Sequence, residues 1–324
     1  MPLSKAELTA GNSLVLSEHA RRLPAYGMIA EQVFPRLLKP GMEQGSLRVY
    51  DKSNLWVPDD HGRPVGGPAR RVDDHELTYV DWTAIVYALD IVATQRELDI
   101  WVQNGNLADE LLTGKIRKIV DKMNLGREKN LADKLQATGN YESGYSTTLD
   151  AGVVWTNTSA SDPITDITTA VNAIENGGVP ATHFVCDLAV WRALERHPQL
   201  LDILKYTKGS MVDAAGFQTL FGLIPIVARC RYAIGETMYP VWGDGAIVCH
   251  INPNANVMAP EDTLTFGRTI VCSDFDVKEY EDETLDHNRA LVEEVQFGYS
   301  HVFVGVDNAT DGDSICGYLI DNAI

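Results

Sequence analysis

The sequence has 324 residues, of which 45% are hydrophobic and 22% are charged. These proportions are typical of globular proteins and exclude a disordered, collagen-like or coiled-coil chain as a whole, and the length suits about two domains of about 150 residues. The net charge of −18 is unevenly distributed, because residues 1–135 hold 18 basic and 19 acidic side chains and residues 136–324 hold 9 and 26. Such an acidic surface repels nucleic acid and does not favour binding it.

The chain opens without a charged segment followed by an apolar run, and its apolar stretches are much shorter than the roughly 20 residues of a membrane span. We therefore expect a protein made in the cytoplasm, without a membrane partner. Five cysteines are widely spaced and form no Cys-x-x-Cys pair: Cys186, Cys230, Cys249, Cys272 and Cys316. This pattern argues against a disulfide framework or a zinc site, so we expect buried, reduced thiols.

Residues 1–38 read as an N-terminal arm. They contain one short amphipathic stretch, and Pro35 ends any helix before the turn at Pro40 and Gly41. Nothing in this segment forms a core by itself.

Two runs rich in Val, Tyr, Trp and Thr follow, at residues 46–57 and 76–91, and a segment rich in proline and glycine separates them at 58–68. Two β-prone runs around a long polar turn segment predict an extended hairpin. Its predicted tip carries three basic side chains, Arg63, Arg70 and Arg71.

A long helix is predicted after Asn106, which suits the N-cap position. Apolar residues recur there at three- and four-residue spacings, at Leu112, Ile116, Ile119, Val120, Met123, Leu131 and Leu135. The pattern allows a kink or break near Gly126. A helix of up to thirty residues is about 45 Å long, which is unusual in a globular protein.

A second helix has strong signals at both ends. Asp162 is a candidate N-cap, Pro163 suits the first helical position, and Gly177 follows the end. Its predicted buried stripe is Ile164, Ile167, Val171 and Ile174.

Shorter elements fill the rest of the chain. We expect a helix that begins after Asp187 and ends at His197, and two more at 200–206 and 213–221. Strands are expected at 179–186, 224–231, 241–251, 264–271, 277–283, 290–306 and 315–320. A hairpin, a long helix, a helical middle and then strands predict an α+β fold and not alternating βαβ units.

Motifs for catalysis and cofactor binding are absent from the sequence: no G-x-G-x-x-G, no G-x-x-x-x-G-K-[ST] and no H-E-x-x-H. The segment from Gly312 to Cys316 falls one residue short of a nucleophile elbow, and no histidine follows it, so we interpret it as a turn before the last strand. We predict no catalytic residue and no cofactor. His183 and His250 lie in apolar strands and are interpreted as core histidines.

Candidate metal ligands are weak. Asp307, Asp311 and Gly312 match a calcium loop, but Ala309 and Tyr318 occupy positions where ligands are required. Two Asp-Asp-His triplets, at 59–61 and 73–75, flank the hairpin tip and are interpreted as solvated loop charge. An acidic run, Glu279, Glu281, Asp282, Glu283 and Asp286, is interpreted as a solvated strand edge. We predict no metal site.

The succession of segments resembles the major capsid proteins of tailed bacteriophages, which have the Hong Kong 97-type fold. The resemblance rests on the order and spacing of several pieces over nearly the whole chain. They are Val33-Phe34-Pro35, Arg48-Val49-Tyr50-Asp51-Lys52, residues 66–72, Tyr87-Ala88-Leu89-Asp90-Ile91, Trp191-Arg192-Ala193-Leu194, His197-Pro198, Phe221-Gly222-Leu223-Ile224-Pro225 and Trp242-Gly243-Asp244.

The resemblance implies four parts. They are an N-terminal arm at 1–38, an extended loop at 39–84, a peripheral domain with a spine helix at 85–160 and 261–306, and an axial domain at 161–260 and 307–324. It also implies a non-enzymatic virion protein that assembles in the host cytoplasm into pentamers and hexamers. These would form an icosahedral shell that encloses double-stranded DNA without sequence-specific binding. The implied partners are other copies of the chain, a portal, and scaffolding or decoration proteins.

A hairpin about forty residues long cannot bury both faces against its own domain, which independently favours an intersubunit contact. The sequence departs from the family in its short arm, where many relatives carry a scaffolding segment of about a hundred residues. Some members cross-link a loop lysine, and Lys52 is the only lysine in the expected loop beyond its first residue, Lys39, but we carry no catalytic residue over to this chain.

Two alternatives remain open at the level of sequence. An encapsulin-like nanocompartment shell has the same fold and packages enzymes instead of a genome. An α+β hydrolase is the alternative from a different functional class.

Overall fold

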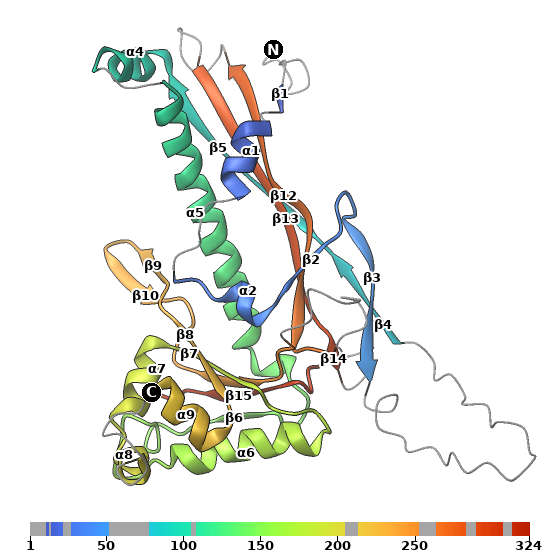
Figure 1. The fold of residues 1–324 in the computed structure, drawn as a ribbon, viewed down its shortest axis with the longest axis vertical. Coiled ribbons are helices and arrows are strands. Elements are labelled where there is room, and N and C mark those ends of the chain that lie inside the picture. Colours follow the sequence, from blue (N-terminus) through green and yellow to red (C-terminus); the bar gives the residue numbers. More distant parts are fainter. Residues whose placement is uncertain are drawn as a thin grey trace, which may run out of the picture.

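Figure 1 shows the fold of the computed structural model, in which a long helix and long strands stand above a smaller sheet that is flanked by helices. The structure describes residues 11–12, 14–21, 27–51, 78–104, 108–204, 213–252, 264–282, 290–306 and 313–324. Strands in these ranges form two five-stranded sheets, a three-stranded sheet and a two-stranded ribbon.

The long sheet has the strand order β1, β12, β13, β5, and β2 pairs in parallel with β12. Its strands are β1 (Gly11–Asn12), β2 (Arg36–Leu38), β5 (Ile85–Thr94), β12 (Gly267–Asp282) and β13 (Ala290–Phe303). β12 and β13 pair antiparallel, with register shifts after Val271 and Ser273. Strands of the arm therefore cover one edge of this sheet, and β5 forms the other edge.

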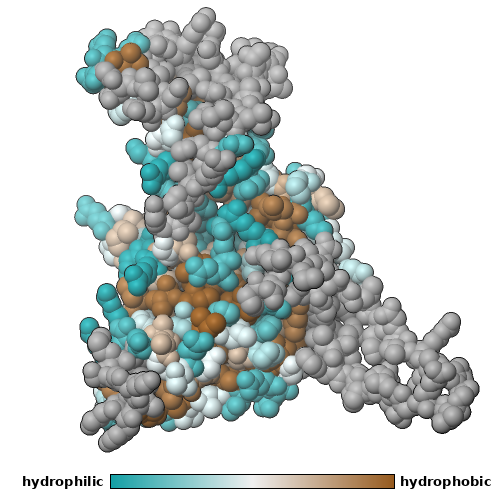
Figure 2. Space-filling view, in the orientation of Figure 1, coloured by the Kyte–Doolittle hydropathy of each residue, from teal (hydrophilic) through white to brown (hydrophobic). Residues whose placement is uncertain are grey.

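The predicted long helix is α5 (Ala108–Leu135), which has 28 residues and packs against β5 and β13. All seven residues of its predicted apolar stripe are buried. The helix continues through Gly126, so the chain has no helix break at the position where the sequence allowed one. The predicted cap Asn106 lies outside the described residues. The surface around the upper part of α5 is mostly hydrophilic, and apolar patches gather lower in the molecule (Figure 2).

Three short helices contact α5, namely α1 (Leu14–Arg21), α2 (Ala30–Val33) and α4 (Gln95–Gln103). Helix α4 was not expected from the sequence, although its start carries a recognisable capping box. The Thr94 hydroxyl accepts a hydrogen bond from the Glu97 N–H at 3.3 Å, and the Glu97 carboxylate accepts one from the Thr94 N–H at 3.4 Å.

The described base of the predicted hairpin consists of β3 (Gln44–Asp51) and β4 (Thr78–Thr83), which pair antiparallel. This part of the hairpin prediction is confirmed, and residues 52–77 lie outside the described residues. The predicted run 76–91 is not one strand, because beyond Ala84 the chain enters β5 and pairs with β13 instead of β3. β14 (Gly305–Val306) extends β3 in parallel.

The smaller sheet has the strand order β6, β15, β11, β7, β8. A 3-10 helix (Thr138–Asn140) follows α5 and leads into this part of the molecule. The strands are β6 (Ser146–Thr148), β7 (His183–Asp187), β8 (Ile224–Ala228), β11 (Ala246–Cys249) and β15 (Gly317–Asp321). The helices beside it are α6 (Pro163–Asn176), α7 (Leu188–Glu195), α8 (Pro198–Leu204) and α9 (Ala214–Phe221).

Three of these helices begin at an aspartate that accepts a hydrogen bond from a backbone N–H of the first turn. The caps are Asp162 on α6 at 3.2 Å, Asp187 on α7 at 2.9 Å and Asp213 on α9 at 2.7 Å. The predicted caps Asp162 and Asp187 are confirmed. In α6, Ile167 and Ile174 are buried, whereas the other two residues of the predicted stripe are partly buried.

Several strand boundaries differ from the predictions. The predicted strands 264–271 and 277–283 are one strand, β12, because bulges near Phe275, with a φ of 40°, keep it paired with β13 through the irregular part. The predicted strand 224–231 ends at Ala228, after which a two-stranded ribbon forms from β9 (Arg231–Ile234) and β10 (Thr237–Pro240). The predicted strands 179–186 and 241–251 begin later, as β7 and β11.

Buried apolar residues form three clusters. The largest cluster lies between the smaller sheet and its helices and includes Trp155, Phe184, Phe217 and Trp242. A second lies between α5 and the long sheet, and a third lies near the base of the hairpin. No helix among the described residues is long and apolar enough to cross a membrane.

Candidate functional site

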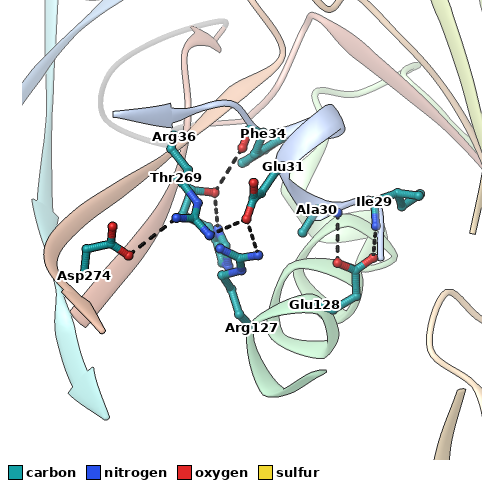
Figure 3. A network of polar contacts seen from close by, with 10 residues as sticks. Ile29, Ala30, Glu31, Phe34, Arg36, Arg127, Glu128, Thr269 and Asp274 are labelled. Carbon is teal, nitrogen blue, oxygen red and sulfur yellow. Dashed lines mark hydrogen bonds and ion pairs between the residues drawn. The ribbon is translucent and has the colours of Figure 1, made fainter. Parts of the chain in front are cut away.

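The arm meets α5 at two buried charged residues. Arg127 and Glu128 are neighbours in the middle of α5, and 1% and 0% of their respective surfaces are exposed. Removing an ion from water costs several kcal/mol, so both side chains need close partners of opposite charge or hydrogen-bonding groups. We call these two residues, with the groups they bind, the arm junction (Figure 3).

Glu128 joins three parts of the chain. Its carboxylate accepts hydrogen bonds from the backbone N–H groups of Ile29 and Ala30, each at 2.8 Å, and from the Trp242 indole N–H at 2.7 Å. The Cys230 thiol lies 3.8 Å from the same carboxylate. Hydrogen bonds to an ionised carboxylate are stronger than neutral ones, so this one side chain holds the arm, the spine helix and the segment before β11 together.

Arg127 begins a chain of alternating charges from α5 through the arm to β12. Its guanidinium lies 2.7 Å from the Glu31 carboxylate, which also pairs with Arg36. Arg36 in turn reaches the Asp274 carboxylate at 3.5 Å. Both guanidinium groups lie within 6 Å of the Phe297 ring centre, at 5.6 Å for Arg127 and 5.9 Å for Arg36, within reach of a cation–π interaction.

The charges in the junction shift one another's titration. Burial acts to raise the pKa of Glu31, but the guanidinium groups of Arg127 and Arg36 outweigh it and hold that pKa below its ordinary value. Burial and the nearby Arg36 lower the pKa of Arg127, although Glu31 opposes this shift. Glu31 is therefore ionised near neutral pH, as its two arginine partners require.

Apolar packing continues the junction along the arm. The Phe34 ring makes edge-to-face contacts with Phe266 and Phe303, at centroid distances of 5.4 and 5.6 Å. A Cβ at Gly267 would lie 2.1 Å from the Phe34 ring, so only glycine allows this close approach. Ile29, Ala30, Val33 and Phe34 of the arm therefore belong to the largest buried cluster.

A pocket of 310 Å³ lies between β4, β13 and the end of α5, and Lys134 and His301 are among its lining residues. The Lys134 amine donates to the His301 carbonyl at 2.6 Å, and burial lowers the pKa of Lys134. Burial, with Lys134 and Arg127 nearby, lowers the pKa of His301 to about 3. Its Nδ1 lies 3.0 Å from the Thr269 hydroxyl, which also lies 3.3 Å from the Phe34 carbonyl. These contacts join β12, β13 and the arm beside the pocket.

Comparison with known proteins begins from sequence. No family model matches the chain. The major capsid protein of Burkholderia phage BcepMu is 25% identical over 177 residues, which are 51% of this chain and 55% of that protein. The chain thus spans about half the length of the curated relative that it matches.

Solved structures match over nearly the whole chain. A phage-related protein from Bordetella bronchiseptica has a TM-score of 0.74 at 19% identity and covers 96% of this chain and 97% of its own. The capsid structure of cyanophage P-SCSP1u has a TM-score of 0.51 at 9% identity, over 91% and 88%. A virus-like particle from Pyrococcus furiosus has a TM-score of 0.50 at 12% identity, over 94% and 96%.

The chain has the phage capsid fold. It is the α+β, Hong Kong 97-type fold that the sequence resemblance implied, so both the resemblance and the fold class are confirmed. Within the capsid fold, α5 and the long strands build one part and the smaller sheet with its helices builds the other, and the arm junction lies where the two meet (Figures 1 and 3).

The predicted contact residues of the capsid fold, Arg63, Arg70 and Arg71, lie outside the described residues, as do Lys52 and both Asp-Asp-His triplets. Residues 307–312 of the calcium-loop match also lie outside them. The described part of the acidic run, through Asp282, belongs to β12. In the described part of the chain, no group of three or more His, Cys, Asp or Glu side chains is placed to hold a metal ion.

The predicted burial of the thiols is confirmed, because all five cysteines are buried and free. Burial raises the pKa of Cys230 and of Cys316 to about 12. Since the thiolate is the reactive form, these side chains are inert packing groups.

The two predicted core histidines are partly buried and hydrogen-bonded. His183 Nδ1 lies 2.8 Å from the Thr182 hydroxyl, and His250 Nδ1 lies 2.8 Å from the Pro180 carbonyl. Burial lowers the pKa of both imidazoles, so they are neutral near pH 7.

The arm junction was missed at the level of sequence, although one signal was present. Position 127 lies four residues after Met123 and four before Leu131, inside the apolar stripe of α5. A charged residue within a buried stripe indicates a buried pair, but its partner Glu31 is almost a hundred residues away.

Proposed function

We propose that this chain is a major capsid protein whose copies assemble into pentamers and hexamers of an icosahedral shell around double-stranded DNA. The observation that carries the proposal is that the capsid fold extends over nearly the whole chain, with 91% covered in the comparison with the capsid structure of cyanophage P-SCSP1u. The partial match to the BcepMu major capsid protein supports the same role. The role is structural, and the protein resides in the virion.

The hairpin base supports self-assembly. β3 and β4 leave the body together, and 26 residues, 52–77, connect them. Tyr79 in β4 remains 50% exposed. A β-ribbon is only marginally stable by itself in water, so packing on a neighbouring subunit would stabilise it.

We keep the four-part division of the chain as part of this proposal: the arm at 1–38, the extended loop at 39–84, and the peripheral and axial domains with the ranges given above. Other proposed partners are a portal and scaffolding or decoration proteins. DNA would be enclosed without sequence-specific contacts, in keeping with the net charge of −18.

Assembly of the purified protein tests this function. Electron microscopy and analytical ultracentrifugation should reveal rings of five or six copies or closed shells. A monomer of 35.7 kDa at every concentration and salt level would contradict the proposal.

An encapsulin-like shell remains the second candidate, because the fold also matches the virus-like particle from Pyrococcus furiosus. Particles isolated from producing cells separate the two candidates. Nuclease-protected double-stranded DNA inside the particles supports the genome container, and enclosed enzymes support the nanocompartment. Assembly of the purified protein into closed shells would argue against the hydrolase alternative.

We also propose that Arg63, Arg70 and Arg71 dock on the acidic surface of an adjacent subunit. Arg70→Glu combined with Arg71→Glu should leave the subunit folded, as judged by circular dichroism and melting, and lower particle yield at low salt. Each exposed ion pair contributes only about 0.2–1 kcal/mol, but a shell repeats it at every contact. Wild-type yield and kinetics in the double variant would leave the arginines as solubilising loop residues.

A further inference from the structure

The two edges of the long sheet differ in how they are covered. On the β12 side, the chain supplies its own cover, because β1 and β2 both pair there. On the other side, β5 pairs with β13 along Ile85–Thr94, and no other described strand pairs with its outer edge. The Val92 carbonyl of β5 accepts a hydrogen bond from Lys115, and elsewhere the outer edge has no described strand partner, so it is a template for a strand of another chain.

The side chains on this open edge are apolar and exposed. The exposed fractions are 59% for Ile85, 40% for Val86, 37% for Tyr87 and 42% for Leu89. Residues 85–90 contain one charged side chain, Asp90, and none of the lysines or prolines that commonly protect a sheet edge. Single exposed apolar residues are ordinary, but four within five consecutive positions on an open edge indicate an interaction surface.

Two exposed lysines of α5 lie toward the side of the helix that contacts β5. Lys115 donates to a β5 carbonyl at 2.8 Å and Asn130 to a β5 hydroxyl at 3.3 Å, which defines the side of the helix that faces β5. Lys122 lies seven residues after Lys115, which is almost two full turns, so it projects from nearly the same side of the helix, and Lys118 lies about one turn before Lys122. Both Lys118 and Lys122 are exposed, and neither forms an ion pair with a described residue.

We propose that β5, with Lys118 and Lys122, is the docking surface for a second copy of this chain, which lays an extended acidic segment along the β5 edge. The inference rests on the proposed shell function and identifies one surface through which subunits would meet. It does not involve the hairpin arginines.

Charge and chemistry select a second copy as the occupant. Residues 136–324 carry 26 acidic and 9 basic side chains, so the two lysines face a neighbour of opposite charge. An open strand edge and apolar side chains suit a polypeptide, whereas nucleic acid binding depends on many phosphate contacts that two lysines do not supply.

Point variants test this surface. Leu89→Glu places a carboxylate where the acidic segment would lie, and Lys118→Glu with Lys122→Glu reverses the flanking charge. Both should keep the wild-type circular dichroism and melting temperature, because the altered side chains are exposed, and should lower particle yield roughly tenfold or more. Val153→Glu, in a turn and 38% exposed, and Arg117→Glu, on another side of α5, are the matched controls and should assemble normally.

Hydrogen exchange supplies a readout that does not depend on a variant. The outward-facing amides of β5 should exchange more slowly in wild-type particles than in free subunits. Wild-type particles, an unaffected Leu89→Glu variant and equal β5 exchange in both states would overturn the docking surface alone. Absence of wild-type particles would overturn the proposed function and this inference with it.

Discussion

The smaller sheet and the long sheet are stabilised in different ways. In the smaller sheet, short strands such as β7 and β11 are almost wholly buried. The neighbouring helices are capped by aspartates that directly precede them in the sequence. The long sheet depends on distant segments, because the arm closes one edge and buried charges on α5 hold the arm in place. Changes in charge should therefore act mainly on the arm junction, and losses of local caps should act only near the helix concerned.

The largest expected effect comes from removing the carboxylate at the centre of the junction. Glu128→Ala leaves two arm N–H groups and the Trp242 indole without an acceptor and should lower the free energy of unfolding by about 3–5 kcal/mol. Denaturant unfolding measures this loss. Glu236→Ala, at an exposed turn, is the control and should change stability by less than about 0.5 kcal/mol. A similarly small loss for Glu128→Ala would show that packing alone holds the arm.

A smaller, local effect is expected in the other part of the molecule. Asp162→Ala removes the N-cap of α6 and should cost about 0.5–2 kcal/mol. Hydrogen exchange should quicken in the first turn of α6 and stay unchanged in residues 27–38. Faster hydrogen exchange in residues 27–38 of this variant would contradict the proposed difference between the two regions. Asp150→Ala, an exposed residue in the preceding turn, is the matched control.

The smallest effect is a pH dependence confined to the arm. Because the folded-state pKa of Glu31 is lowered, its ion pairs contribute stability above the ordinary value of 4.5, and that contribution is lost as the pH falls through the lowered pKa. Glu31 is nearly half exposed, so solvent screens much of the gain. Amides near Ile29 and β2 should begin to exchange faster in this acidic range than those of β7.

Glu31→Gln should remove that difference between the arm and β7. An equal acid response in both regions, or one that persists in the Gln variant, would assign the sensitivity to other carboxylates.

Local elements could be predicted because their causes lie within a few residues. The apolar spacing in α5 and the aspartate before Pro163 specify where helices bury their stripe and where they begin. Even α4 had its signal in Thr94 and Glu97. The order of such segments was also enough to indicate the capsid fold.

Only the tertiary structure decided which strands pair and which charges are buried. The run 76–91 divides at Ala84 because one half pairs with β3 and the other with β13, more than 200 residues later. Likewise, Arg127 and Glu128 find their partners only when the arm packs against α5. Strand pairing and charge burial depend on groups that are far apart in the sequence and meet only in the folded chain. Local sequence patterns therefore do not specify them.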